Sequence, residues 1–70
     1  MRVLKSAKIV LSDKAPKIDC AVRNISITGA RLEISTSYGI PANFDLLLDG
    51  ARRHCRVAWM HATQIGVAFL

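Results

Sequence analysis

One short segment of the chain gathers residues that can bind a ligand through hydrogen bonds. It holds Asn24, Ser26 and Gly29, with Arg23 before them and Arg31 after them. The amide and the hydroxyl can contact a base edge or a phosphate, and a glycine lets backbone N–H groups approach an anion with no Cβ in the way. None of these groups is a nucleophile or a base without an activating partner. The segment therefore indicates ligand binding and not catalysis.

The same residues also suit a plain turn. Asn and Ser side chains hydrogen-bond to nearby backbone groups in turns, and Gly adopts a positive φ there. Turn chemistry explains every residue of the segment as well as a ligand does, so the spacing alone leaves both interpretations open.

Other residues that carry chemistry do not form a recognisable site. His54 and His61, with two cysteines at wide spacing, lack the closely paired ligands of a zinc site. Asp19 and Asp45 are expected to be isolated carboxylates on the outer faces of strands, with no adjacent histidine or second acid for acid–base catalysis. We therefore expect no metal, no cofactor and no enzymatic activity.

Length and charge limit the alternatives. Seventy residues allow one domain, spanning 1–70, and a hydrophobic fraction of 51% predicts a folded chain. Ten Lys and Arg against five Asp and Glu give a net charge of +5, which favours an anionic partner. The basic start has no apolar run behind it and no window is long enough to span a membrane, so we expect a cytoplasmic protein with no membrane partner. In that compartment Cys20 and Cys55 are expected to be free thiols.

Apolar and polar residues alternate along the chain with a period of two, which predicts short strands. These strands must position the segment that holds Asn24, Ser26 and Gly29. The expected strands are 6–11, 18–22, 30–34, 44–48, 55–59 and 65–69, with a hairpin at Asp49-Gly50 and a single helical turn over 35–38. Trp59, Phe44 and Phe69 fall at core positions of this alternation. Gly66 and Ala68 leave small residues on the second face of the last strand, as where another strand packs closely. Six such strands predict an all-β fold, a small six-stranded antiparallel barrel.

The motif segment and the last two expected strands resemble the PilZ domain family. Asn24-x-Ser26-x-x-Gly29 matches the family motif and stands between two alternating strands, as the family fold requires. Cys-Arg-Val-x-Trp at 55–59 and Gly-Val-Ala-Phe at 66–69 are similar to the last two strands of that barrel. The resemblance covers nearly the whole chain, and it implies a split-barrel type of fold with a short N-terminal arm at about 1–5.

The resemblance also implies a ligand, cyclic di-GMP, and a role in bacterial signalling. In the family, the Asn, Ser and Gly of this motif contact a guanine and a phosphate, which assigns these roles to Asn24, Ser26 and Gly29. The other half of the family site is an Arg-x-x-x-Arg segment before the first strand. Arg2 is similar to its second arginine, and the first would lie upstream of Met1. Loss of one charge-assisted contact removes about 1.5 to 3 kcal/mol, or roughly ten- to a hundredfold in affinity.

Three cations are weaker candidates for the site, and two other functions stay open. Lys5, Arg23 and Arg31 lie close to the candidate segments in sequence, although a solvated strand face is the commoner role for such residues. A degenerate PilZ domain would serve as a protein-interaction module without nucleotide, and a downstream protein partner is expected in either case. A small basic nucleic-acid-binding barrel is the third possibility, and the scarcity of aromatic residues for stacking makes a nucleic-acid partner the least favoured.

Overall fold

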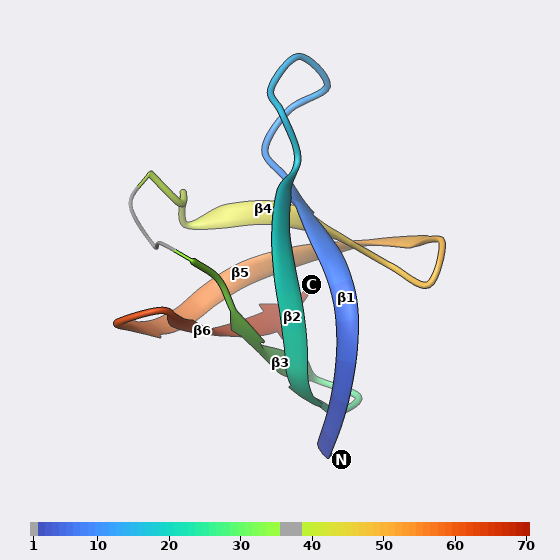
Figure 1. Cartoon of the computed structure of the whole chain (residues 1–70), viewed down its shortest axis with the longest axis vertical. Coiled ribbons are helices and arrows are strands. Elements are labelled where there is room, and N and C mark those ends of the chain that lie inside the picture. Colours follow the sequence, from blue (N-terminus) through green and yellow to red (C-terminus); the bar gives the residue numbers. More distant parts are fainter. Residues whose placement is uncertain (1, 36–38) are drawn as a thin grey trace.

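The chain folds into six antiparallel strands that close into a barrel (Figure 1). The computed structural model describes residues 2–35 and 39–70, with residues 2 and 3 described by their backbone alone. The strands are β1 (Arg2–Val10), β2 (Ile18–Ile25), β3 (Gly29–Glu33), β4 (Asn43–Leu48), β5 (Ala51–His61) and β6 (Gln64–Phe69). Around the barrel the order is β1-β2-β3-β6-β5-β4, and β4 pairs with β1 to close it. The predicted six-stranded antiparallel barrel is confirmed.

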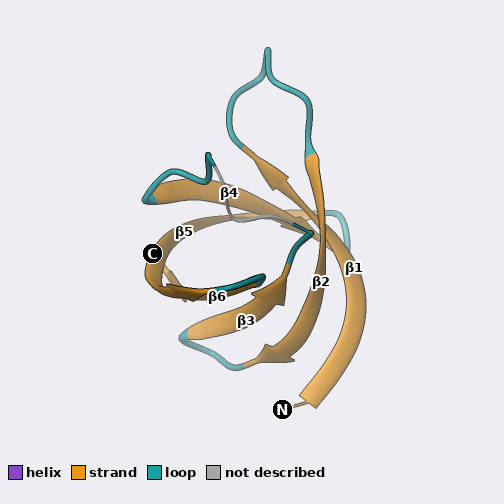
Figure 2. Cartoon of the chain, turned by 60° about the vertical axis from the view of Figure 1, so that its left-hand side comes forward, coloured by secondary structure: helices purple, strands orange, loops and turns teal. Residues whose placement is uncertain are grey.

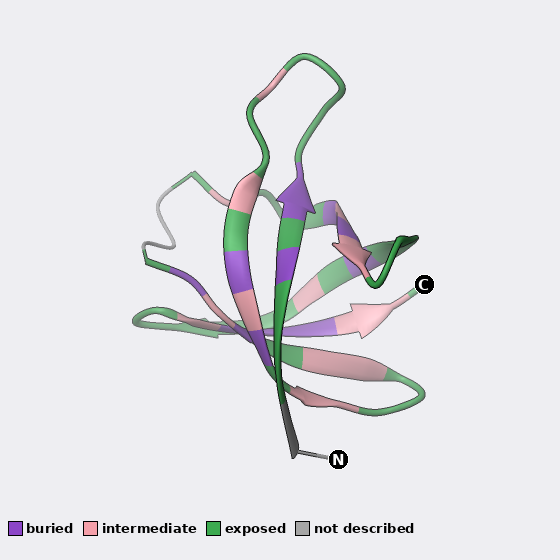
Figure 3. Ribbon diagram, turned by 45° about the vertical axis from the view of Figure 1, so that its right-hand side comes forward, coloured by how far each residue is buried: buried purple, intermediate pink, exposed green. Residues whose placement is uncertain are grey.

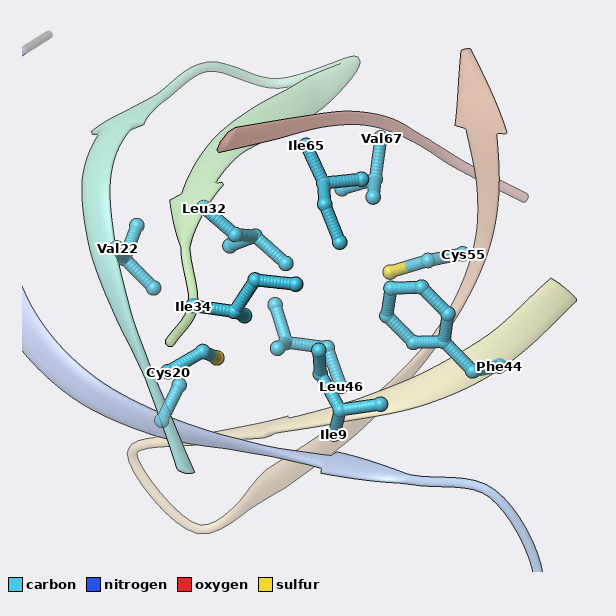
Figure 4. Close-up of a cluster of buried hydrophobic side chains, with 11 residues drawn as sticks. Ile9, Cys20, Val22, Leu32, Ile34, Phe44, Leu46, Cys55, Ile65 and Val67 are labelled. Carbon is cyan, nitrogen blue, oxygen red and sulfur yellow. The ribbon is translucent and has the colours of Figure 1, made fainter. Parts of the chain in front are cut away.

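The core follows from the alternation of apolar residues along each strand. Burial switches from one residue to the next, which Figure 3 shows as alternating colours along β1 and β2. The inward side chains meet inside the barrel (Figure 4). The largest fully buried ones are Ile9, Val22, Leu32, Leu46, Cys55 and Ile65. Each such aliphatic side chain contributes about 1.5 to 3 kcal/mol by leaving water.

The hairpin between β4 and β5 turns on two residues. Asp49 and Gly50 have φ angles of 53° and 78°, the left-handed values that a two-residue hairpin loop of the type I′ kind requires. The predicted hairpin at Asp49-Gly50 is confirmed. A loop of this length fixes the pairing of the two strands, and it sets Asp45 opposite His54.

The first strand begins earlier than its sequence pattern suggests. The expected strand was 6–11 with an arm over about 1–5, whereas β1 starts at Arg2. The backbone of Arg2 pairs with Asn24, and a register shift separates that pair from Lys5 and Val22. Residues 2–5 therefore belong to the sheet. Figure 2 shows this end of the chain on the same side of the barrel as the connection between β2 and β3.

Two cysteines lie inside the barrel as free thiols, as predicted for Cys20 and Cys55. Burial raises the pKa of Cys20 to about 11, with the nearby charge of Asp19 adding to the effect.

The helical turn expected over 35–38 falls largely outside the described residues. Over 2–35 and 39–70, no helix is long and apolar enough to cross a membrane.

The aromatic residues divide between core and surface. Phe44 is buried, as predicted. Phe69 is half-buried, and the guanidinium of Arg53 lies 4.0 Å above the centre of its ring. The prediction that Trp59 is a core residue was wrong, because Trp59 is 46% exposed. The register of β5 against β6 shifts between Val57 and Trp59, and this one-residue irregularity turns the indole to the outer face.

Candidate ligand-binding site

The connection between β2 and β3 is a turn held by its own hydrogen bonds. The Ser26 N–H donates to the Gly29 carbonyl oxygen at 2.8 Å, and the Ser26 hydroxyl donates to the same oxygen at 3.3 Å. The hydroxyl oxygens of Ser26 and Thr28 lie 3.3 Å apart. The Thr28 carbonyl accepts a hydrogen bond from the Phe69 N–H at 2.8 Å. The turn is therefore fixed internally and anchored to the end of β6.

Gly29 has a packing role in addition to any role toward a ligand. A Cβ at this position would overlap the backbone carbonyl oxygen of Val67, since β3 and β6 approach closely where Gly29 pairs with Ala68. The glycine is thus required by the meeting of two backbones, and not by a positive φ. Its bare backbone also leaves the outer face of the sheet open beside the turn.

An open hollow of about 350 Å³ lies on the outer wall of the barrel beside this turn. The hollow crosses from the turn over β3 and β6 to β5, and it is lined by Asn24, Ser26, Thr28, Gly29, Ala30, Arg31, Ala58, Trp59, Gly66, Val67 and Ala68. The structure therefore brings the three motif residues predicted from the sequence into one concave surface. Arg31 joins them there.

Trp59 is the residue of this surface that the sequence analysis missed. Its indole covers Gly66 on the neighbouring strand so closely that a Cβ at Gly66 would overlap the indole Nε1. The small face of β6 was expected to accommodate another strand, and Gly66 instead accommodates this side chain. The signal was present in the sequence, since a Gly that pairs with a Trp across two strands allows the ring to lie over the sheet.

The weaker candidates separate into residues at the hollow and residues held elsewhere. Arg31 lines the hollow. Arg23 pairs with Glu33 at 2.8 Å, and Lys5 pairs with Asp49 at 2.7 Å in the β4–β5 turn. Neither Arg23 nor Lys5 is among the lining residues. Of Arg2 the structure gives the backbone alone, which lies beside Asn24.

The expectation that Asp45 is an isolated carboxylate without an adjacent histidine was wrong. Arg52 Nε lies 2.5 Å from Asp45 Oδ2, and His54 Nδ1 contacts Asp45 Oδ1. The hydrogen bond from Arg52, helped by the charges of His54 and Arg52, lowers the pKa of Asp45 against the opposing effect of burial. Cys55, the next residue after His54, faces the barrel interior, so it is not presented to this pair. Neither Asp45 nor His54 is among the residues that line the hollow.

Comparison with known proteins identifies the family of the chain. No curated protein and no solved structure matches the chain significantly. The family model of the PilZ domain matches residues 1–70, the full length of the chain. Together with the closed six-stranded barrel and the motif turn at its wall, this match establishes that the chain belongs to the PilZ domain family.

Proposed function

We propose that this domain binds cyclic di-GMP at the hollow beside the β2–β3 turn. PilZ domains are in general receptors for this nucleotide, and they are binding modules. The observation that carries the proposal is that Asn24, Ser26 and Gly29 line one concave surface together with Arg31 and Trp59. Hydrogen-bonding groups, a cation and an exposed aromatic face are the three kinds of contact that a guanine nucleotide needs.

Each residue has a distinct task in this proposal. Asn24 and Ser26 hydrogen-bond to a guanine edge and to phosphate oxygens, and Gly29 keeps the backbone accessible. Arg31 offers a planar guanidinium for a phosphate, since no carboxylate of the described residues is paired with it. Trp59 supplies a surface for base stacking, which is worth about 1 to 3 kcal/mol per base.

The start of β1 is the second part of the proposed site. The backbone of Arg2 pairs with Asn24, so residue 2 lies next to the motif turn. Its guanidinium can then stack on a base or bind a phosphate held by the turn. Ligand binding would alter the surface at this end of β1, which a downstream protein partner contacts.

A heteronuclear NMR titration of the ¹⁵N-labelled chain with cyclic di-GMP tests the proposal. Chemical-shift changes are expected along the hollow, at residues 24–31, 58–59 and 66–68, and at the start of β1. Ser26→Ala should weaken the binding that these changes report by at least about tenfold, whereas Lys14→Ala, in the exposed β1–β2 loop, should not. A folded chain whose spectrum stays unchanged at millimolar nucleotide would reject the proposal and leave a protein-interaction module without nucleotide.

A further inference from the structure

The carboxylates of the chain pair with some of its cations and leave others unpaired. All five Asp and Glu residues pair with a cation of the same chain. The pairs are Asp13–Arg52, Asp19–Lys8, Glu33–Arg23, Asp45–Arg52 and Asp49–Lys5. Five cations of the described part of the chain have no carboxylate partner: Lys14, Lys17, Arg31, Arg53 and Arg56. Lys14 and Lys17 lie in the β1–β2 loop, and Arg53 lies over the ring of Phe69, which leaves Arg31 and Arg56. Both are exposed, and both belong to the strands that carry the hollow.

The strand register places Arg56 on the far side of the hollow from the motif turn. Gly29 pairs with Ala68 on β6, and Ala68 pairs with Arg56 on β5, so these three form one row across the wall. Val57 and Val67 in the next row pack on the core, so the row of Arg56 faces outward. Two inter-strand spacings separate Gly29 from Arg56, or roughly 10 Å.

The next outward row carries the aromatic residue. Arg31 pairs with Gly66, and Gly66 pairs with Trp59. The middle strand β6 therefore contributes Gly66 and Ala68, which have no long side chains of their own, to the floor. Trp59 covers Gly66, and Arg56 pairs with Ala68, which lines the hollow, although Arg56 itself is not among the lining residues. Ala68 and Gly66 are two residues apart on β6, so Arg56 and Trp59 belong to neighbouring outward rows of the wall, roughly 7 Å apart.

We infer that Arg56 is a specificity-determining residue that binds the O6 and N7 edge of a guanine stacked on Trp59. The inference rests on the proposed function, and it adds a contact on β5 that lies outside the motif. A guanidinium donates two parallel hydrogen bonds to these two acceptors of guanine. Adenine offers an amino group in place of O6, so the same arginine discriminates against it.

The test compares the affinities of cyclic di-GMP and cyclic di-AMP for three proteins by calorimetry, with NMR titration for weak binding. These are the unmodified chain, Arg56→Ala, and Lys17→Ala, which removes the same charge from the exposed β1–β2 loop at the opposite end of the barrel (Figure 1). Arg56→Ala should weaken the binding of cyclic di-GMP roughly five- to 150-fold more than it weakens the binding of cyclic di-AMP, because both bases share N7 and only guanine has O6. Lys17→Ala should change the affinities for both nucleotides equally and by less than about threefold.

The outcomes separate this inference from the proposed function. If Arg56→Ala weakens the binding of both nucleotides by the same factor, or has the same effect on both affinities as Lys17→Ala, Arg56 does not recognise the base. The inference is then overturned, while nucleotide binding stands. If the unmodified folded chain binds neither nucleotide, the proposed function fails first, and the inference fails with it. Circular dichroism establishes that each variant is folded, as expected for substitutions of exposed residues.

Discussion

Trp59 and Gly66 form a contact on the outer wall of the barrel in which the indole occupies the space that a Cβ would need. The contact exists because the register of β5 shifts just before Trp59 and turns the ring outward over β6. It gives the hollow an aromatic surface next to the motif turn.

Replacing Gly66 with Ala should displace the indole. The new methyl group would overlap Nε1, so the ring must move, and we expect a loss of about 1 to 3 kcal/mol in the free energy of unfolding. Urea denaturation followed by circular dichroism measures this loss. In a Trp59→Ala background the same substitution should cost much less, since the overlapping ring is gone. An equal cost in both backgrounds would show that the contact with Trp59 is not the cause.

Replacing Gly29 with Ala should be costly for a different reason. Its Cβ would overlap the Val67 carbonyl oxygen, which is backbone and can move only if the β3–β6 pairing opens. We expect a loss of about 2 to 4 kcal/mol by urea denaturation. Trp59→Ala should not relieve it. A mild loss, or a loss that depends on Trp59, would contradict the close approach of β3 and β6.

The Cys20 thiol should be protected from modification in the folded chain. Its raised pKa of about 11 reduces the thiolate at pH 8 by about a hundredfold relative to an ordinary thiol, and burial reduces access further. In a Cys55→Ala variant, a thiol reagent should therefore react with Cys20 at least about a hundred times more slowly without urea than with it. Equal rates in the folded and unfolded chain would show that the thiol is not buried.

The lowered pKa of Asp45 predicts a specific dependence of stability on pH. Its carboxylate is stabilised in the folded state, so this contribution is present above the unfolded-state pKa of about 3.9 and is lost as the pH falls through the lower folded-state value. Asp45→Asn should lower the urea midpoint at pH 7, and the difference from the unmodified chain should shrink below about pH 4. Asp19→Asn is the control, on a far more exposed carboxylate. A difference that persists at low pH would contradict the assignment.

Much of the fold was predictable because its strands obey simple rules. Alternation predicted the barrel, and Asp49-Gly50 predicted the hairpin. The same two-residue loop fixes the register that pairs Asp45 with His54, so this pairing could have been derived by counting outward from the turn.

The outward face of Trp59 and the early start of β1 depend on shifts in strand register, which an alternation with a period of two does not reveal. The shift before Trp59 inverts its face, so a residue in phase with Val57 leaves the core. The shift between Arg2 and Lys5 interrupts the alternation at the start of β1, and that part of the strand was expected as an arm. Asn24, Ser26 and Gly29 were found because the family motif names them, whereas Trp59 required the three-dimensional register.

Nucleotide binding at the motif turn is measured by isothermal titration calorimetry of the purified chain with cyclic di-GMP, run beside the Ser26→Ala variant. We expect saturable binding to the unmodified chain and a loss of at least about tenfold in affinity for Ser26→Ala, since the hydroxyl would donate to a charged phosphate. No binding heat up to millimolar nucleotide in a chain shown to be folded, or equal affinity for both proteins, would contradict it.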